Sequence, residues 1–199
     1  MSATAAPAPS DRSDFRTVTT GGAAVGVLTA VAVVAFLAAS RLLPDVRGGV
    51  ESLIVLAAGI TVAFLPAQRT GARGVDGIAG AAAVGLVGTV VFSAIDIVLL
   101  RPFKAYPWTW DAIGGGSTWW YLPIWWMLGT FLAWMGGIVT AAGSEATLGR
   151  RALPPIAATI VVALIVRLAG VTLALPVATG GAFTLVLAAL ALVALARKG

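Results

Sequence analysis

The sequence contains no cysteine, no histidine and no asparagine. Without cysteine, the chain forms no disulfide and holds no iron–sulfur cluster through thiolates. Without histidine, it lacks the usual ligand of haem iron and catalytic zinc and the commonest general base near neutral pH. We therefore expect no cofactor and no metal, and we assign no catalytic residue. His-ligated haem, iron–sulfur clusters and His- or Cys-ligated zinc are all argued against.

Charge is also scarce. Only 11% of the 199 residues are charged while 59% are hydrophobic, and the mean hydropathy is +0.99. Soluble domains are about one-quarter charged, and a soluble fold of this length needs charged side chains over much of its surface. The composition therefore predicts an all-α, polytopic integral membrane protein whose first partner is the lipid bilayer.

Six apolar segments follow one another along the chain. Each approaches or exceeds the roughly 20 residues that a helix needs to cross the hydrocarbon layer. Helices are expected because lipid cannot satisfy exposed backbone groups. We predict a single transmembrane domain over 21–199, a bundle of six helices at about 21–43, 50–68, 77–100, 119–143, 153–177 and 181–196. The last two helices would be joined by a tight turn at 178–180.

The first twenty residues are polar and small, and they contain proline. We interpret 1–20 as a flexible cytoplasmic tail. A secretory signal peptide is the competing interpretation. Asp11 and Asp14 disfavour it, because they occupy the place of a basic n-region, and the apolar run that follows is long for such a peptide.

Lys and Arg are distributed unevenly between the predicted loops. If the N-terminus is cytoplasmic, the inside carries Arg12, Arg16, Arg69, Arg73, Arg150, Arg151, Arg197 and Lys198. The outside then carries Arg41, Arg47, Arg101 and Lys104. This bias places both termini in the cytoplasm, and we expect the bacterial cytoplasmic (inner) membrane. The net charge of +5 is spread without a basic face, so no nucleic-acid partner is expected.

Six of the seven tryptophans lie between residues 104 and 126, a stretch that this topology places on the outer side. Tryptophan and tyrosine prefer the headgroup layer of a membrane. A Trp-rich extracytoplasmic loop is therefore predicted, serving either as a plain aromatic belt or as an aromatic vestibule for a ligand or partner. The candidate vestibule residues are Trp108, Trp110, Asp111, Trp119, Trp120, Tyr121, Trp125 and Trp126.

Two ionisable residues fall inside predicted helices. Asp96 lies about one turn below the outer end of the third helix, and Arg167 lies near the middle of the fifth. A charge at such depth is costly unless it is paired or hydrated, so a contact between Asp96 and Arg167 is our hypothesis for both. The pair would either fix helix register or form part of a site in a polar cavity.

Small residues recur at four-residue spacing in the third and fourth helices, as Gly77, Ala81 and Gly85 and as Gly129, Ala133 and Gly137. Such faces let helices approach closely, and they could also dock other membrane subunits. The sequence therefore favours a small non-enzymatic membrane protein, either an accessory subunit of a larger complex or a small-molecule-binding transport component. The alternative is an enzyme that acts on a lipid-linked substrate from the outer face.

Overall fold

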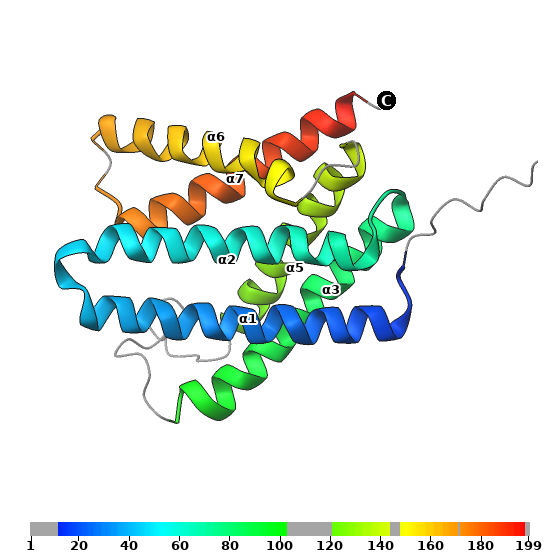
Figure 1. Ribbon diagram of the computed structural model, residues 1–199, viewed down its shortest axis with the longest axis horizontal. Coiled ribbons are helices and arrows are strands. Elements are labelled where there is room, and N and C mark those ends of the chain that lie inside the picture. The colour runs from blue at the N-terminus through cyan, green and yellow to red at the C-terminus, as the bar shows by residue number, and fades with distance from the viewer. Residues whose placement is uncertain (1–11, 103–120, 144–147, 171, 198–199) are drawn as a thin grey trace, which may run out of the picture.

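The computed structural model describes the chain except residues 1–11, 103–120, 144–147, 171 and 198–199 (Figure 1). The described residues form helices and turns, and six helices are long and apolar enough to cross a membrane. The prediction of an all-α bundle with six spans is therefore confirmed.

The helices run α1 (Phe15–Leu42), α2 (Arg47–Thr70), α3 (Val75–Ile95), α5 (Tyr121–Ala142), α6 (Leu148–Leu168) and α7 (Leu175–Ala196). A short 3₁₀ turn, η1 (Pro44–Val46), precedes α2, and a π-helical turn, η2 (Asp96–Leu100), extends α3. Helices α1 and α2 lie antiparallel, α3 packs on α1 and α5, and α7 packs on α2, α5 and α6 (Figure 1). The start of α1 and the end of α7 lie at the same end of the bundle.

Glycines bring α3 close to both of its main neighbours. A Cβ added at Gly26 of α1 would lie 2.7 Å from the carbonyl oxygen of Gly88, and one added at Gly85 would lie 2.7 Å from that of Gly129. Backbones at this separation leave no room for a side chain. The small-residue faces noted in the third and fourth predicted helices therefore pack on each other and are occupied inside the bundle.

The first helix begins earlier than the sequence predicted, at Phe15 instead of Gly21. The Asp14 carboxylate caps it, accepting hydrogen bonds from the backbone N–H of Thr17 at 3.0 Å and from the Thr17 hydroxyl at 2.7 Å. An N-cap of this kind satisfies donors that the helix cannot satisfy itself. Residues 15–20 are thus helical and not part of a flexible tail, while residues 1–11 lie outside the described residues.

The break between the last two helices also differs from the prediction. Helix α6 ends at Leu168, and Gly170 adopts φ of +78°, a left-handed conformation that glycine adopts without steric cost. Helix α7 then starts at Leu175 with Pro176 in its first turn, where proline is tolerated. The predicted turn at 178–180 lies inside α7, so the fifth helix is shorter and the sixth longer than expected.

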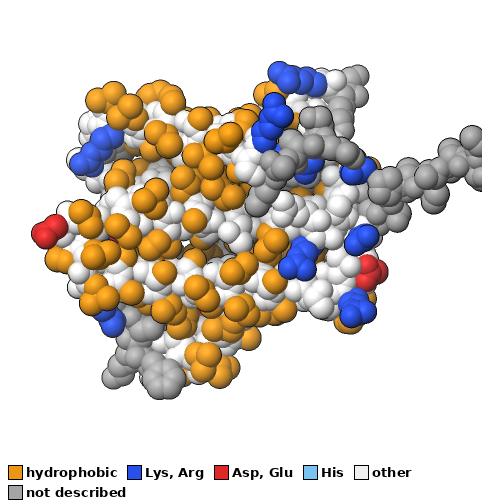
Figure 2. All heavy atoms as spheres, viewed as in Figure 1, with side chains coloured by type: hydrophobic (Ala, Val, Ile, Leu, Met, Phe, Trp, Pro, Cys, Tyr) orange, Lys and Arg blue, Asp and Glu red, His pale blue; other side chains and the backbone are white. Residues whose placement is uncertain are grey.

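The surface separates into a hydrophobic band with charged side chains gathered towards the two ends (Figure 2). The band covers the middle of α1, α2, α6 and α7. It is the pattern expected of a protein whose middle is surrounded by hydrocarbon.

Candidate functional site

A large cavity lies at the centre of the bundle, with a volume of about 710 Å³. Helices α1, α2, α3, α5 and α7 all contribute to its wall. The buried core formed by α2, α5 and α7 adjoins the cavity, and two members of that core, Leu132 and Phe183, also line the cavity. The size falls within the range of small-molecule sites.

Small residues in the wall leave this space between the helices. Helix α2 contributes Ala58 and Gly59 to the wall, and α7 contributes Gly180 and Gly181. These residues project little or no side chain, so the helices are separated without the gap being filled. Larger apolar side chains such as Phe36 and Val62 complete the wall.

The hydroxyl groups in the wall are engaged by the helices that carry them. The Thr29 hydroxyl donates to the Val25 carbonyl at 2.8 Å, and the Thr184 hydroxyl donates to the Gly180 carbonyl at 2.9 Å. A hydroxyl that donates to a carbonyl of its own helix has no proton left for a ligand. Among the described lining residues, Asp96 is then the one ionisable group.

Asp96 is buried, with 3% of its surface exposed, and it begins the π-helical turn η2. The wider turn brings residue 101 over residue 96: the backbone N–H of Arg101 donates to the Asp96 carbonyl at 2.9 Å. The Arg101 side chain then reaches the carboxylate, with Nε 3.1 Å from Oδ2. π-turns inside helices are frequent at functional sites, and this one places a neutral but strongly polar pair at one end of an apolar cavity.

Two tryptophans pack beside this pair. The Trp125 ring lines the cavity and meets Phe92 edge to face, with ring centroids 6.0 Å apart. The Trp126 indole N–H donates to the Ser93 hydroxyl at 3.3 Å, and Ser93 in turn donates to the Thr89 carbonyl at 2.7 Å. The edge-to-face contact holds Trp125 against α3, and the hydrogen bond holds Trp126 there.

The predicted vestibule is only partly within the described residues. Trp125 takes part in the cavity wall, and Trp126 binds α3 beside it. Five other members lie outside the described residues, as does the side chain of Tyr121. These are Trp108, Trp110, Asp111, Trp119 and Trp120.

Asp96 and Arg167 are not brought together. Arg101 is the ion-pair partner of Asp96, and Arg167 lies exposed in the last turn of α6. Because α6 ends at Leu168, Arg167 stands at a helix terminus and not at mid-membrane. A cation in the last turn of a helix interacts favourably with the helix dipole, and an exposed arginine near a helix end is able to reach the headgroup layer with its long side chain. The shorter helix thus removes the need for a buried partner.

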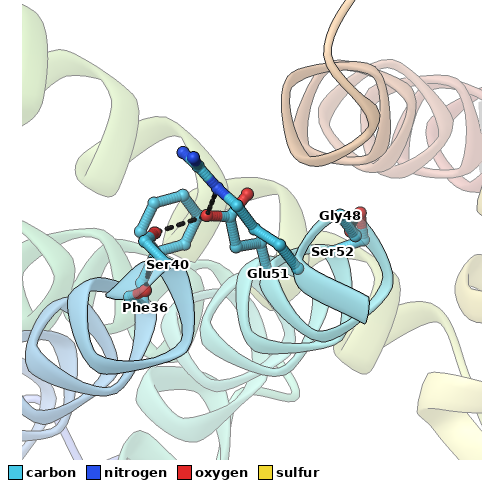
Figure 3. A network of polar contacts seen from close by, with 6 residues as sticks. Phe36, Ser40, Gly48, Glu51 and Ser52 are labelled. Atoms are coloured by element: carbon cyan, nitrogen blue, oxygen red, sulfur yellow. Dashed lines mark hydrogen bonds and ion pairs between the residues drawn. The ribbon is translucent and has the colours of Figure 1, made fainter. Parts of the chain in front are cut away.

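A second buried carboxylate, Glu51, lies near the same end of the bundle as Asp96 (Figure 3). Arg47 donates to it from one turn earlier on α2, with 2.7 Å between Nε and Oε1. The Ser40 hydroxyl of α1 has two acceptors within reach, the Glu51 carboxylate and, at 2.9 Å, the Phe36 carbonyl. The network therefore joins α1 to α2 one turn above the cavity residues Phe36, Ile54 and Val55.

The contact of Glu51 with α1 was not predicted from the sequence, in which residue 51 lies at the start of the second predicted helix (50–68). The four-residue spacing between Arg47 and Glu51 is a signal for an ion pair on one helix face. The Ser40 contact carries no such signal, because it depends on how α1 and α2 pack. Among the described residues, no group of three acidic side chains gathers in a way that could hold a metal ion.

Comparison of the chain with known protein families, with curated proteins and with solved structures gave no match.

Proposed function

We propose that this chain is a non-enzymatic, multi-pass membrane protein that binds a lipophilic small molecule in the central cavity, as a component of transport. The observation that carries the proposal is the apolar cavity of about 710 Å³ with one polar end at Asp96. Apolar walls with a few placed polar groups are the usual form of a small-molecule site.

The two ends of the cavity favour an amphiphile. An apolar chain suits the wall of Val33, Val62 and Leu132, whereas a head group would lie beside Asp96 and Arg101. Because the Asp96–Arg101 ion pair carries no net charge, a head group with hydroxyl or amide groups suits it better than a charged head group does. The ligand class is thus a neutral single-chain amphiphile.

The charges at the two ends support an orientation. Seven arginines lie at the end where α1 begins and α7 ends: Arg12, Arg16, Arg69, Arg73, Arg150, Arg151 and Arg197. Four lie at the other end: Arg41, Arg47, Arg101 and Arg167. The proposal places the richer end in the cytoplasm of a bacterial cell, within the inner membrane, so that the head group lies near the outer face.

Docking into a larger complex is not favoured by the packing. The glycine and alanine faces that suggested partner subunits are used between α1, α3 and α5. Ligand binding within the chain itself therefore has more support than an accessory role.

The binding proposal is tested by filling the cavity. Gly181 lines it on the same face of α7 as Val177 and Leu185, and a Cβ added at Gly181 meets nothing within 4 Å. Gly181, Val177 and Leu185 are all exposed lining residues, so Gly181→Phe should place an aromatic ring at the exposed side of the cavity without a clash. Gly49→Phe is the matched control, because Gly49 is equally open but does not line the cavity.

The probe is monoolein, a neutral single-chain lipid with two hydroxyls in its head. Each protein is purified in mild detergent and incubated with monoolein, and bound lipid is counted by native mass spectrometry. Wild type and Gly49→Phe should retain one monoolein, and Gly181→Phe should bind it at least ten times more weakly. Equal binding by all three proteins, or none by the wild type, would contradict the proposal.

A further inference from the structure

A groove runs between α1 and α2 and adjoins the cavity. It has a volume of about 220 Å³ and is lined by residues of these two helices alone. Four residues line both spaces: Thr29, Ala32, Ile54 and Ala58. The surface is visibly hollowed between α1 and α2, with hydrophobic side chains around the hollow (Figure 2). Thr29, Ala32, Ile54 and Ala58 thus lie between the groove and the cavity.

The groove lies at the depth of the hydrocarbon core. Thr29 is near the middle of α1, roughly 20 Å from either helix end at 1.5 Å per residue. Ala58 is near the middle of α2. Water and polar solutes are excluded from this depth, so the molecules that reach the groove are those dissolved in the bilayer.

The groove presents no polar barrier to an alkyl chain. Its two hydroxyls are both engaged within their own helices, Thr29 with the Val25 carbonyl and Thr61 with the Ala57 carbonyl, each at 2.8 Å. The other lining side chains are Leu, Val, Ile and Ala. A hydrocarbon chain that slides between the helices therefore leaves one apolar surrounding for another.

We propose that a single-chain amphiphile enters the cavity sideways from the bilayer core, tail first, through the groove between α1 and α2. This inference rests on the proposed binding function and names the route of entry. The chain passes between Ala32 and Ala58, and the head group then lies at the Asp96–Arg101 end. Entry from the bilayer spares the ligand a passage through water.

The absence of native cysteine permits a test on the folded protein. Ala57 lines the groove but not the cavity, and it is exposed. In Ala57→Cys, the thiol is modified after folding with either methyl or benzyl methanethiosulfonate. The same variant then carries either a small or a large group at position 57. Ala35→Cys is the control, because Ala35 is exposed on α1 and lines neither space.

The proteins are loaded with deuterated monoolein and placed in nanodiscs that contain ordinary monoolein. Native mass spectrometry follows the replacement of one isotopic form by the other. The benzyl group at position 57 should slow exchange at least tenfold relative to the methyl group, while the amount bound at equilibrium stays the same. At position 35 the two reagents should give equal rates.

Three results would overturn lateral entry. Equal exchange rates for the two groups at position 57 would show that the ligand uses another route, while binding itself would stand. A benzyl group that lowered the bound amount without slowing exchange would make the groove part of the binding site and not its entrance. A wild-type protein that retained no monoolein would remove both this inference and the binding proposal.

Discussion

Arg101 binds Asp96 twice, with its backbone N–H on the carbonyl at 2.9 Å and its side-chain Nε on the carboxylate at 3.1 Å. Both contacts depend on the π-helical turn η2, in which backbone hydrogen bonds span five residues. The turn therefore determines where the polar end of the cavity lies.

Arg101→Met should destabilise the protein by about 1–3 kcal/mol, because a buried carboxylate loses a charged hydrogen-bond donor. A double-mutant cycle with Asp96→Asn, measured as the free energy of unfolding in mixed micelles, should show coupling between the two residues. The same cycle with Arg167→Met should show none, since Arg167 is exposed at the end of α6. Coupling of Asp96 to Arg167 in place of Arg101 would support the pair expected from sequence.

Ser40 should matter more than Ser52, although both serines lie beside Glu51 in Figure 3. Ser40 joins α1 to the Glu51 carboxylate of α2, whereas the Ser52 hydroxyl donates to the Gly48 carbonyl of its own helix at 2.6 Å. Ser40→Ala should cost about 1 kcal/mol of unfolding free energy, and Ser52→Ala should cost clearly less. Equal costs would mean that the contact between the helices contributes nothing.

Gly170 and Gly181 should respond to alanine in opposite directions. Gly170 has φ of +78°, so alanine there should cost about 1–2 kcal/mol. Gly181 lies inside α7 with open space around its Cα, so alanine should stabilise by about 0.5–1 kcal/mol. Unfolding midpoints of the two variants in one detergent provide the measurement. If the fifth helix ran unbroken to residue 177, alanine at 170 would stabilise instead.

The cap of α1 should weaken in acid. Hydrogen bonds from the Thr17 hydroxyl and backbone N–H lower the pKa of Asp14 below its usual value. Because the folded pKa is the lower one, the cap contributes fully above the unperturbed pKa of the carboxyl and is lost as pH falls through the folded value. Amide hydrogen-exchange protection at Thr17 should fall over that range. Asp14→Asn provides the control, since asparagine caps helices without titrating, and its protection should not depend on pH there.

The number of spans followed from sequence because it depends on a property of each segment alone. A run of about 20 apolar residues is long enough to cross the hydrocarbon layer whatever its neighbours are. The close approach of α3 to α5 also followed, since Gly85 and Gly129 leave room for a neighbouring helix wherever one packs. Helix ends were less accurate. Leu173 and Val177 continue the apolar run past Gly170, so hydropathy does not reveal the break.

The site required the tertiary structure. The sequence indicated which ionisable residues fall inside predicted membrane-spanning helices, and Asp96 was among them. Its partner was decided by the π-turn, and the contact of Ser40 with Glu51 by the packing of α1 on α2. The cavity arises because small residues of α2 and α7 meet at one level of the bundle. A span is a property of one helix, whereas a cavity is a property of the space between five.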